Sequence, residues 1–425
     1  MKDKSTLFKE LFRGDSIVWT VYLVLTLISL IEVFSAISSL SFKSGDYQVH
    51  IMQHAIMLGL GLITVLVVHR LPVKMYRLIP YITYPLSFAL LISLTVMSVF
   101  KEERVNDASR WIFGFQPSEV AKLAIVSGVA LLLARHQKND GCGQDAMKPL
   151  LIMVGILLAL IAPENGSTAL LLATVVYMMM VVGRIPLNQM MKLTGTLVLS
   201  GSLFLSLILF VPPKVYQEVP GTHRFVTWRN RILNHFNKPE VPAAKFDVEG
   251  EAQVAHSNIA IASSNIFGKG PGNSVQRDFL THSYSDYIYA ISIEELGLLG
   301  GAFITLLYLI LLYRAGLIAK RCDRYFPAFL VLGSALMIVC QAMLHMMVSV
   351  GLFPVTGQPL PLVSKGGTSI IFNSIYIGMI LGVSRHLIEK EEKIQTENKA
   401  LISVKDTLSE NTQIKEHKSE QNINL

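Results

Sequence analysis

The chain has 425 residues, of which 52% are hydrophobic and 16% are charged, a balance that excludes an ordinary soluble domain and indicates a polytopic membrane protein. The net charge of +7 is accounted for by lysines and arginines of the loops and the tail, so no nucleic-acid partner is expected. The three cysteines have no paired spacing, which argues against a disulfide framework or a metal knuckle.

The first element is a cytoplasmic N-terminus, residues 1–15, followed by a retained span that is too long for a signal sequence and lacks a small-residue cleavage site. Windows of about 20 apolar residues predict ten spans in all. They lie near 16–38, 51–69, 79–99, 117–135, 149–163, 166–183, 193–213, 287–313, 327–350 and 367–384. The fifth and sixth are joined only by "PENG", so a re-entrant pair is an alternative there. The predicted fold is therefore all-α, a polytopic integral membrane protein with about ten transmembrane helices.

The orientation follows from lysines and arginines in the short loops, which concentrate on the cytoplasmic side. One set of loops, with the N-terminus, carries 16 of them, and the opposite set carries five. Both termini are thus expected in the cytoplasm, and residues 100–116, the "PENG" turn, residues 214–286 and residues 351–366 outside. Residues 386–425, rich in Glu, Lys, Asn and Gln, are expected to form a disordered cytoplasmic tail.

The first outer segment continues into a span as "SRWIFGFQPSEVAKLAIV". Pro117 and Ser118 favour a helix start at this point. Glu119 and Lys122 are three residues apart and can form a structural ion pair on one helix face. Alternatively, Lys122 lies one turn inside the span with Arg110 just before it, which is typical of an anion site. The sequence leaves both interpretations open.

Three other outer segments carry unusual residues. In the "PENG" turn, a helix cap by Asn165, Ser167 or Thr168 explains the pattern around Glu164 without a function. The 214–286 loop has 73 residues, a length typical of functional loops, and its "GKGPG" stretch suits either a ligand or plain turns. Residues 351–366 lead into "KGGTS", residues 365–369, at the start of the last span, which suits a phosphate at a helix N-terminus or a simple connector.

Acidic residues stand at the start of the eighth span and inside it. Asp286 is expected to cap the helix, and a carboxylate there can also act as a general base toward a sugar hydroxyl. Glu294 and Glu295 lie about 100° apart around the helix and are not expected to point the same way. At least one of them is expected to pack against polar groups inside the bundle.

Three long stretches resemble the SEDS family, the shape, elongation, division and sporulation proteins. They are "RWIFGFQPSEVAKLA", "GKGPGNSVQRDFLTHSYSDYIYAISIEELG" and "GLFPVTGQPLPLVSKGGTS". The resemblance covers residues 16–385, a SEDS transmembrane domain that includes the extracytoplasmic loop 214–286, and is closer to the division member than to the elongation member. It implies a peptidoglycan glycosyltransferase that polymerises lipid II at the outer face of the cytoplasmic membrane.

The resemblance also implies site residues. Asp286 matches the family's catalytic acid, although "HSYSDYIYA" is one residue longer after His282 than the family's motif. Lys365 stands where the family has an aromatic residue. The positions that match substrate-binding motifs are Arg110, Gln116, Ser118, Glu119, Lys122, Gln253, Ser257, Ser364, Lys365 and Thr368.

In the reaction that the resemblance implies, Asp286 would take the proton of a lipid II hydroxyl as it attacks the anomeric carbon of an undecaprenyl-diphosphate-linked glycan, with inversion. Arg110 and Lys122 would offset charge on the diphosphate. A divalent cation, Mg²⁺ or Mn²⁺, is compatible with this chemistry, but no metal-ligand cluster is visible. The implied partners are a class B penicillin-binding protein and other division proteins, at the septum. The alternatives are a lipid II flippase, a non-catalytic scaffold or an elongation polymerase.

Overall fold

The computed structural model describes residues 10–44, 47–100, 115–138, 141–211, 223–236, 252–280 and 283–423. Within these ranges the chain is almost entirely helical, apart from one antiparallel pair of two-residue strands, β1 (Gln137–Lys138) and β2 (Gly141–Cys142). The α-helices are α2 (Ser16–Ser44), α3 (Tyr47–Val68), α4 (Val73–Tyr76), α5 (Ile79–Phe100), α6 (Pro117–His136), α7 (Met147–Ile161), α8 (Gly166–Val182), α9 (Leu187–Phe210), α11 (His223–Phe236), α12 (Ala252–Ala262), α13 (Ile288–Lys320), α14 (Tyr325–Ser349) and α15 (Thr368–Ile423). Two 3₁₀ turns, η2 (Gln144–Ala146) and η4 (Gln276–Asp278), complete the order.

Each of the ten predicted spans coincides with one apolar helix. Nine helices among the described residues are long and apolar enough to cross a membrane, and α8 is a shorter apolar helix of 17 residues. The prediction of an all-α, polytopic membrane protein is therefore confirmed. Several helices extend beyond the predicted bounds: α2 ends six residues later, α9 begins six residues earlier, α13 continues to Lys320 and α15 continues to Ile423.

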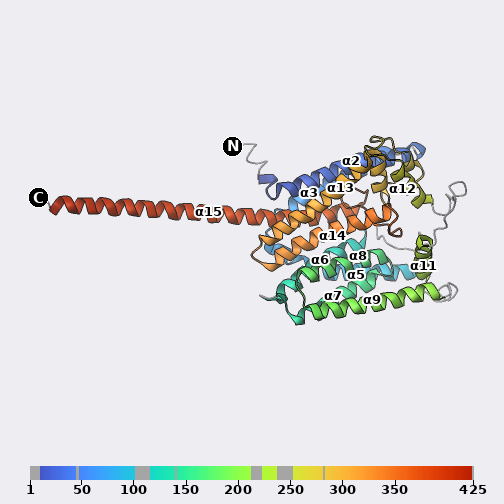
Figure 1. Cartoon of the computed structure of the whole chain (residues 1–425), viewed down its shortest axis with the longest axis horizontal. Helices are drawn as coiled ribbons and strands as arrows, with labels where there is room; N and C mark the ends of the chain where they lie inside the picture. The colour runs from blue at the N-terminus through green and yellow to red at the C-terminus, as the bar shows by residue number, and fades with distance from the viewer. Residues whose placement is uncertain are drawn as a thin grey trace.

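The helices form one bundle with a buried centre and an exposed edge. α14 packs against α13, α6, α15 and α8 and so lies at the centre. In α6, 83% of the apolar window is buried, whereas in α9 the share is 6%, which places α9 at the edge. Figure 1 shows α15 projecting as a rod from one end of the bundle, while α11 and α12 lie at the opposite end. The described parts of the long 214–286 loop therefore gather at the end away from the α15 rod.

Two helix starts follow directly from local sequence. Pro117 occupies the first turn of α6, where its missing N–H has no helical partner to lose. Asn165 caps α8, and its side-chain oxygen accepts a hydrogen bond from the Thr168 N–H at 3.2 Å. The predicted capping of the "PENG" turn is thereby confirmed, with Asn165 as the cap.

The C-terminal tail differs from the disordered segment expected from its composition. α15 continues as one helix of 56 residues to Ile423. Glu, Lys and Gln are good helix formers, and no Gly or Pro follows Gly382 to interrupt the helix. Ion pairs fix the first turns beyond the membrane, because Arg13 contacts Glu392, Arg321 contacts Glu391, and Lys390 contacts Asp323. The tail thus extends a helix that is already anchored.

α13 is interrupted at Gly297, where φ is 77° and ψ is −180°. The break frees backbone groups on both sides, and the segment 265–270 pairs with them. The N–H groups of Lys269 and Gly270 donate to the carbonyls of Glu294 and Glu295 at 3.0 and 2.8 Å. On the other side of the break, the Leu298 N–H donates to the Asn265 carbonyl at 3.1 Å. The outer loop is therefore joined to α13 through the backbone.

Gly297→Ala is expected to destabilise the protein by about 1–3 kcal/mol, because L-residues rarely adopt this backbone conformation. In addition, the new Cβ would lie 2.2 Å from the Ile266 carbonyl oxygen. Thermal unfolding of the purified protein in detergent measures the effect. Gly316→Ala is the control, because it lies in the same helix and its Cβ would have no neighbour within 4 Å. Equal melting temperatures for the two variants would contradict this account of the break.

Candidate active site

The loop between α14 and α15 joins the segment that carries Asp286. The Lys365 N–H donates to the Tyr284 carbonyl at 3.0 Å, and the Ser364 hydroxyl donates to the Ser285 carbonyl at 2.8 Å. Ser364 Oγ also accepts from the Leu360 N–H at 2.8 Å, which holds its own loop in place. Ser364 and Lys365, predicted from the sequence as binding residues, are thus brought beside Asp286, 78 or more residues away in the chain.

Asp286 does not cap α13, contrary to the sequence-based expectation. The helix begins at Ile288, its N-cap residue is Tyr287, and no side chain caps it. Instead, the half-buried Asp286 side chain accepts a hydrogen bond from the Ser285 hydroxyl at 2.6 Å, and its carboxylate interacts electrostatically with His345 of α14. Asp286 is the last residue of the turn at 283–286, and Tyr287 lies between it and the first helical residue, Ile288. The Asp286 carboxylate is therefore oriented by Ser285 rather than by the helix. This geometry leaves it able to accept a proton.

Lys365 lies half-buried near this acid. Its Nζ is 5.2 Å from the centroid of the Tyr284 ring and 3.4 Å from Nδ1 of His50 in α3. Burial lowers the pKa of the Lys365 ammonium from its ordinary value. A cation held over an aromatic ring, rather than beside a carboxylate, retains a charge that an anionic ligand can use.

Glu119 and Lys122 form an ion pair, with 2.8 Å between Lys122 Nζ and Glu119 Oε1. Their side chains are 3% and 1% exposed. Lys122 also donates to Gln341 Oε1 at 3.1 Å, and Gln341 Nε2 donates to the Pro359 carbonyl at 2.9 Å. The geometry favours the structural ion pair over an open anion site, because the pair is enclosed and supports the loop that carries Lys365.

A second set of buried polar groups lies on the other side of this loop. His345 Nδ1 donates to the Gln358 carbonyl at 2.8 Å, which leaves Nε2 as an acceptor on a neutral ring. Gln358 Nε2 donates to Thr168 Oγ1 at 2.8 Å, joining the loop to α8. His345 Nε2, Gln358 Oε1, Ser118 Oγ and Thr368 Oγ1 have no hydrogen-bond partner among the described residues. A buried polar atom without a partner in the protein can be satisfied by water or by a ligand.

The remaining predicted residues have different surroundings. Ser257 is buried on α12, and its hydroxyl donates to the Ser349 carbonyl at 2.7 Å, which attaches α12 to the end of α14. Gln253 is half-buried on the same helix. Gln116 precedes α6 and lines a small crevice with Ser118 and Glu164. Arg110 and His282 lie outside the described residues.

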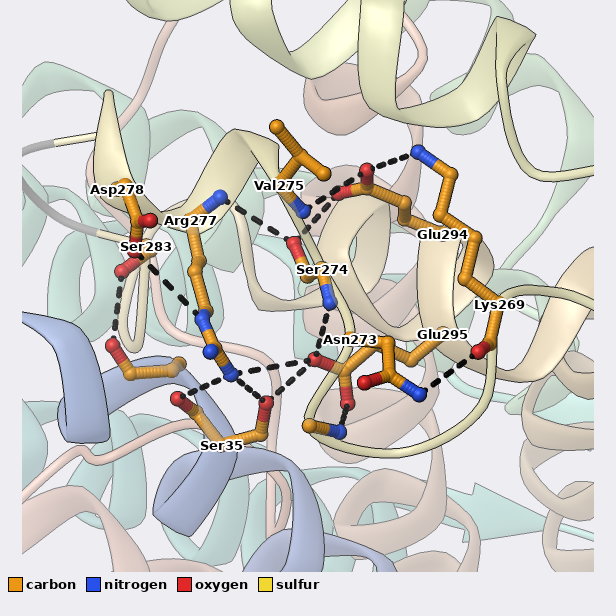
Figure 2. A network of polar contacts seen from close by, with 12 residues as sticks. Ser35, Lys269, Asn273, Ser274, Val275, Arg277, Asp278, Ser283, Glu294 and Glu295 are labelled. Carbon is orange, nitrogen blue, oxygen red and sulfur yellow. Dashed lines mark hydrogen bonds and ion pairs between the residues drawn. The ribbon is translucent and has the colours of Figure 1, made fainter.

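Glu294 and Glu295 both bind the outer loop (Figure 2), in agreement with the expectation that at least one of them packs against polar groups inside the bundle. Glu294 accepts from Lys269 Nζ at 2.6 Å and from the N–H groups of Val275 and Gln276, both at 3.2 Å. Glu295 accepts from the Gly272 N–H at 2.9 Å. Both side chains are fully buried. They diverge around the helix, but residues 269–277 wrap around it and reach both.

α2 is joined to the same network. Arg277 donates to Ser35 Oγ at 2.8 Å, and its guanidinium lies 3.9 Å from Glu295 (Figure 2). Ser35 in turn donates to the Glu295 carboxylate. The network therefore fixes the outer loop to two spans near the segment that carries Asp286, which gives Glu294 and Glu295 a structural role.

An apolar cavity of 810 Å³ lies between α7, α8, α9, α11 and residues 353–356. Its wall includes Leu170, Phe204, Trp228, Leu344 and Phe353. Trp228 of α11 packs on Phe204 of α9 with ring centroids 5.8 Å apart. The cavity therefore borders the same 351–366 loop that carries Lys365, and its lining suits a hydrocarbon chain.

Several of these residues were not singled out from the sequence. Gln341, His345 and Glu32 are buried polar residues within apolar spans, and intramembrane polar residues are a signal that would have found them. Gln358 and Arg277 lie in outer loops, where only the folded contacts distinguish them. Among the described residues, no group of three or more His, Cys, Asp or Glu could hold a metal ion.

The fold defines the class of the protein, which is an all-helical, multi-pass membrane protein. The sequence model of the family described as "Cell cycle protein", which groups FtsW, RodA and SpoVE, matches residues 15–389. The chain belongs to this family, the SEDS family, and the resemblance drawn from its motifs is confirmed.

Individual relatives agree with this assignment. The chain is 30% identical over 382 residues to stage V sporulation protein E of Bacillus subtilis, which covers 88% of this chain and 97% of that protein. It is 29% identical over 379 residues to the probable peptidoglycan glycosyltransferase FtsW of Aliivibrio salmonicida, covering 86% of this chain and 88% of that protein. Both the division and the sporulation branches are thus represented at similar identity.

Two solved structures share the fold. A chain of a peptidoglycan synthase complex, solved in work on the coordination of polymerization and crosslinking, has a TM-score of 0.66 at 22% identity, covering 88% of this chain and 98% of that chain. The rod shape determining protein RodA of Thermus thermophilus has a TM-score of 0.59 at 20% identity, covering 88% and 97%. At these identities the likeness establishes the helical architecture alone.

Proposed function

We propose that this protein is a peptidoglycan glycosyltransferase that polymerises lipid II at the outer face of the cytoplasmic membrane. The observation that carries the proposal is the attachment of Ser364 and Lys365 to the segment of Asp286, because it combines a proton acceptor with a cation that has no salt bridge among the described residues. The names of the FtsW relatives support the same activity. Membership of the family supports the choice of lipid-linked substrate.

In the proposed reaction, a hydroxyl of the acceptor lipid II attacks the anomeric carbon of the donor glycan. Asp286 takes the hydroxyl proton as the new glycosidic bond forms, and the bond to the undecaprenyl diphosphate breaks with inversion. Negative charge grows on the departing diphosphate, and a cation near it lowers the barrier. Lys365 is available for this task, whereas Lys122 supports the loop through its pair with Glu119. Arg110, which the sequence predicts for the same task, lies outside the described residues. The 810 Å³ apolar cavity would receive a polyprenyl chain.

A flippase is less well supported by the buried charges. Lys122 is paired with Glu119, and Glu294 and Glu295 are bound by the outer loop, so these groups do not line an open path among the described residues. The direct test is incubation of the purified protein, with and without its transpeptidase partner, with purified lipid II and analysis of glycan length on a gel. Polymer formation supports the proposal, and movement of lipid II across vesicles without polymer would support the flippase.

The partner would be a class B penicillin-binding protein, which cross-links the strands made here, alongside other division proteins. The solved peptidoglycan synthase complex, one chain of which has a similar fold, coordinates polymerization with crosslinking and supports such a pairing. A division role at the septum is part of the proposal and rests on motifs closer to the division branch. In this proposal the transmembrane domain spans residues 16–385, and residues 386–425 form a cytoplasmic extension, which is helical as far as Ile423.

Membrane orientation gives a separate prediction. With the three native cysteines replaced, Leu352→Cys should react with a membrane-impermeant thiol reagent in intact spheroplasts, whereas Lys320→Cys should react only after lysis. Both positions are well exposed, Leu352 at 67%, unlike Gln358 at 2%, so reactivity reports the side of the membrane. Labelling of Lys320→Cys alone in intact cells would place Asp286 in the cytoplasm and contradict the proposal.

A further inference from the structure

Lys365 differs from three other cations at the outer end of the bundle. Lys122, Lys269 and Arg277 each lie within 4 Å of a carboxylate. No acidic side chain within the described ranges forms a salt bridge with Lys365. Its polar neighbour is His50 Nδ1, which must accept because an ammonium only donates. Lys365 therefore carries a half-buried positive charge that has no counter-ion in the part of the chain that the structure describes.

Such an arrangement has an energetic cost that an anion would remove. Partial burial disfavours a charge unless an opposite charge or hydrogen-bonding groups replace the lost water. The Tyr284 ring offers one weak partner, with the ammonium 5.2 Å from its centroid. A doubly charged ligand above Lys365 would supply the missing counter-ion.

A second observation lies three residues further along the chain. Thr368 is the first residue of α15, and its buried Oγ1 has no hydrogen-bond partner among the described residues. The start of a long helix carries partial positive charge and favours phosphate groups. Lys365, the Gly366–Gly367 pair and Thr368 thus present an ammonium, a hydroxyl and a helix N-terminus within four residues.

We propose that Lys365, with the hydroxyl of Thr368, binds a phosphate of the donor's lipid diphosphate. This inference rests on the proposed glycosyltransferase function and deepens it by assigning the leaving group to a residue that replaces an aromatic of the family pattern. Lys365 is hydrogen-bonded through its backbone to Tyr284, two residues before Asp286, so the diphosphate and the proton acceptor would lie on two segments that this bond joins. Lys365 then offsets the charge that develops as the diphosphate leaves.

The backbone contact also makes the proposal testable by substitution. The Lys365 N–H, not its side chain, bonds to the Tyr284 carbonyl, so changes of side chain leave the loop's attachment in place. Lys365→Gln removes the charge, Lys365→Arg keeps it, and Lys365→Tyr introduces an aromatic residue. Lys320→Gln is the matched control, because it removes an exposed lysine at the C-terminal end of α13, away from Asp286.

The experiment measures binding of farnesyl diphosphate to the purified full-length protein in detergent by isothermal titration calorimetry. Lys365→Gln and Lys365→Tyr should weaken binding about 10- to 100-fold, as expected for a lost hydrogen bond to a charged group. Lys365→Arg should stay within about threefold of the native protein, because a guanidinium also binds phosphate. Thr368→Val should produce a smaller loss. Unchanged binding by Lys365→Gln or Lys365→Tyr would overturn the proposal.

Two further arms identify the ligand. Inorganic diphosphate should bind much more weakly than farnesyl diphosphate, and farnesol should bind without sensitivity to Lys365. Equal binding of inorganic and farnesyl diphosphate would overturn the assignment to a lipid-linked donor. Because the readout is binding, it is separate from polymerisation: a protein that binds farnesyl diphosphate through Lys365 but makes no glycan refutes the glycosyltransferase and leaves the phosphate site standing.

Discussion

Asp286→Asn is expected to reduce polymerisation of lipid II by about 100- to 10,000-fold, the range typical of a lost general base. Asparagine has nearly the same size and can still accept the Ser285 hydroxyl bond, which is 2.6 Å long in the native protein. It cannot take a proton from the attacking hydroxyl. Since Asp286 does not cap α13, the substitution removes no helix cap, and the melting temperature should change little.

The matched control is Asp278→Asn, which makes the same chemical change at an exposed acid of the same outer segment, with 53% of its side chain exposed. Initial rates of glycan synthesis with purified lipid II, at equal amounts of folded protein, measure both variants. Asp278→Asn should retain near-native rates. Robust polymer from purified Asp286→Asn, free of any contaminating polymerase, would remove Asp286 from the role of base.

The second large effect concerns stability and the pair of Glu119 and Lys122. Lys122→Met should destabilise the protein by about 3–5 kcal/mol, because it leaves Glu119 as an uncompensated buried charge. The native side chains are 3% and 1% exposed, so water cannot replace the lost ammonium. The bond from Lys122 to Gln341 is also lost, and with it the support of Gln341 for Pro359. Thermal unfolding in detergent measures the change.

Combining Lys122→Met with Glu119→Gln should recover most of this loss, because no net charge then remains in the pair. Lys192→Met on the exposed face of α9 is the control and should melt like the native protein. A Lys122→Met variant with native stability but no polymerisation would instead assign Lys122 to the substrate, the interpretation that the sequence had left open. Loss of stability in Lys122→Met would therefore assign Lys122 to a structural ion pair, and loss of polymerisation alone would assign it to an anion site.

The parts of the fold that sequence predicted well are those that depend on local patterns. Ten apolar windows mark ten helices, Pro117 marks the start of α6, and Asn165 caps α8. Each of these signals acts within one or two helical turns. The prediction of a disordered tail was wrong because low hydrophobicity was given more weight than helix propensity. In addition, the ion pairs that anchor the first turns of the tail come from distant segments.

The sequence predicted which residues form the site better than it predicted how they are arranged. Asp286, Ser364 and Lys365 are brought together by hydrogen bonds between segments 79 and more residues apart, such as that from Ser364 to Ser285, and no local period encodes such contacts. The prediction that Asp286 caps α13 was wrong because the helix begins one residue later than expected, after the turn at 283–286. That one loop binds both Glu294 and Glu295 was not predicted, because an ideal helix says nothing of a loop that wraps around it. Gln341 and Gln358 acquire their roles only through the folded loop.

The network around Glu294 and Glu295 has a consequence for biogenesis. A charged residue entering the bilayer costs about 2.5–3.5 kcal/mol on the insertion scale, so two adjacent acids would hinder the entry of α13. Their cationic partners, Lys269 and Arg277, precede them in the chain, Lys269 by 25 residues in its bond to Glu294. Lys269 and Arg277 are therefore synthesised before Glu294 and Glu295, so both cations are present when the acidic residues reach the membrane. Synthesis in the reverse order would expose both carboxylates unpaired, so the order of the segments itself eases insertion of α13.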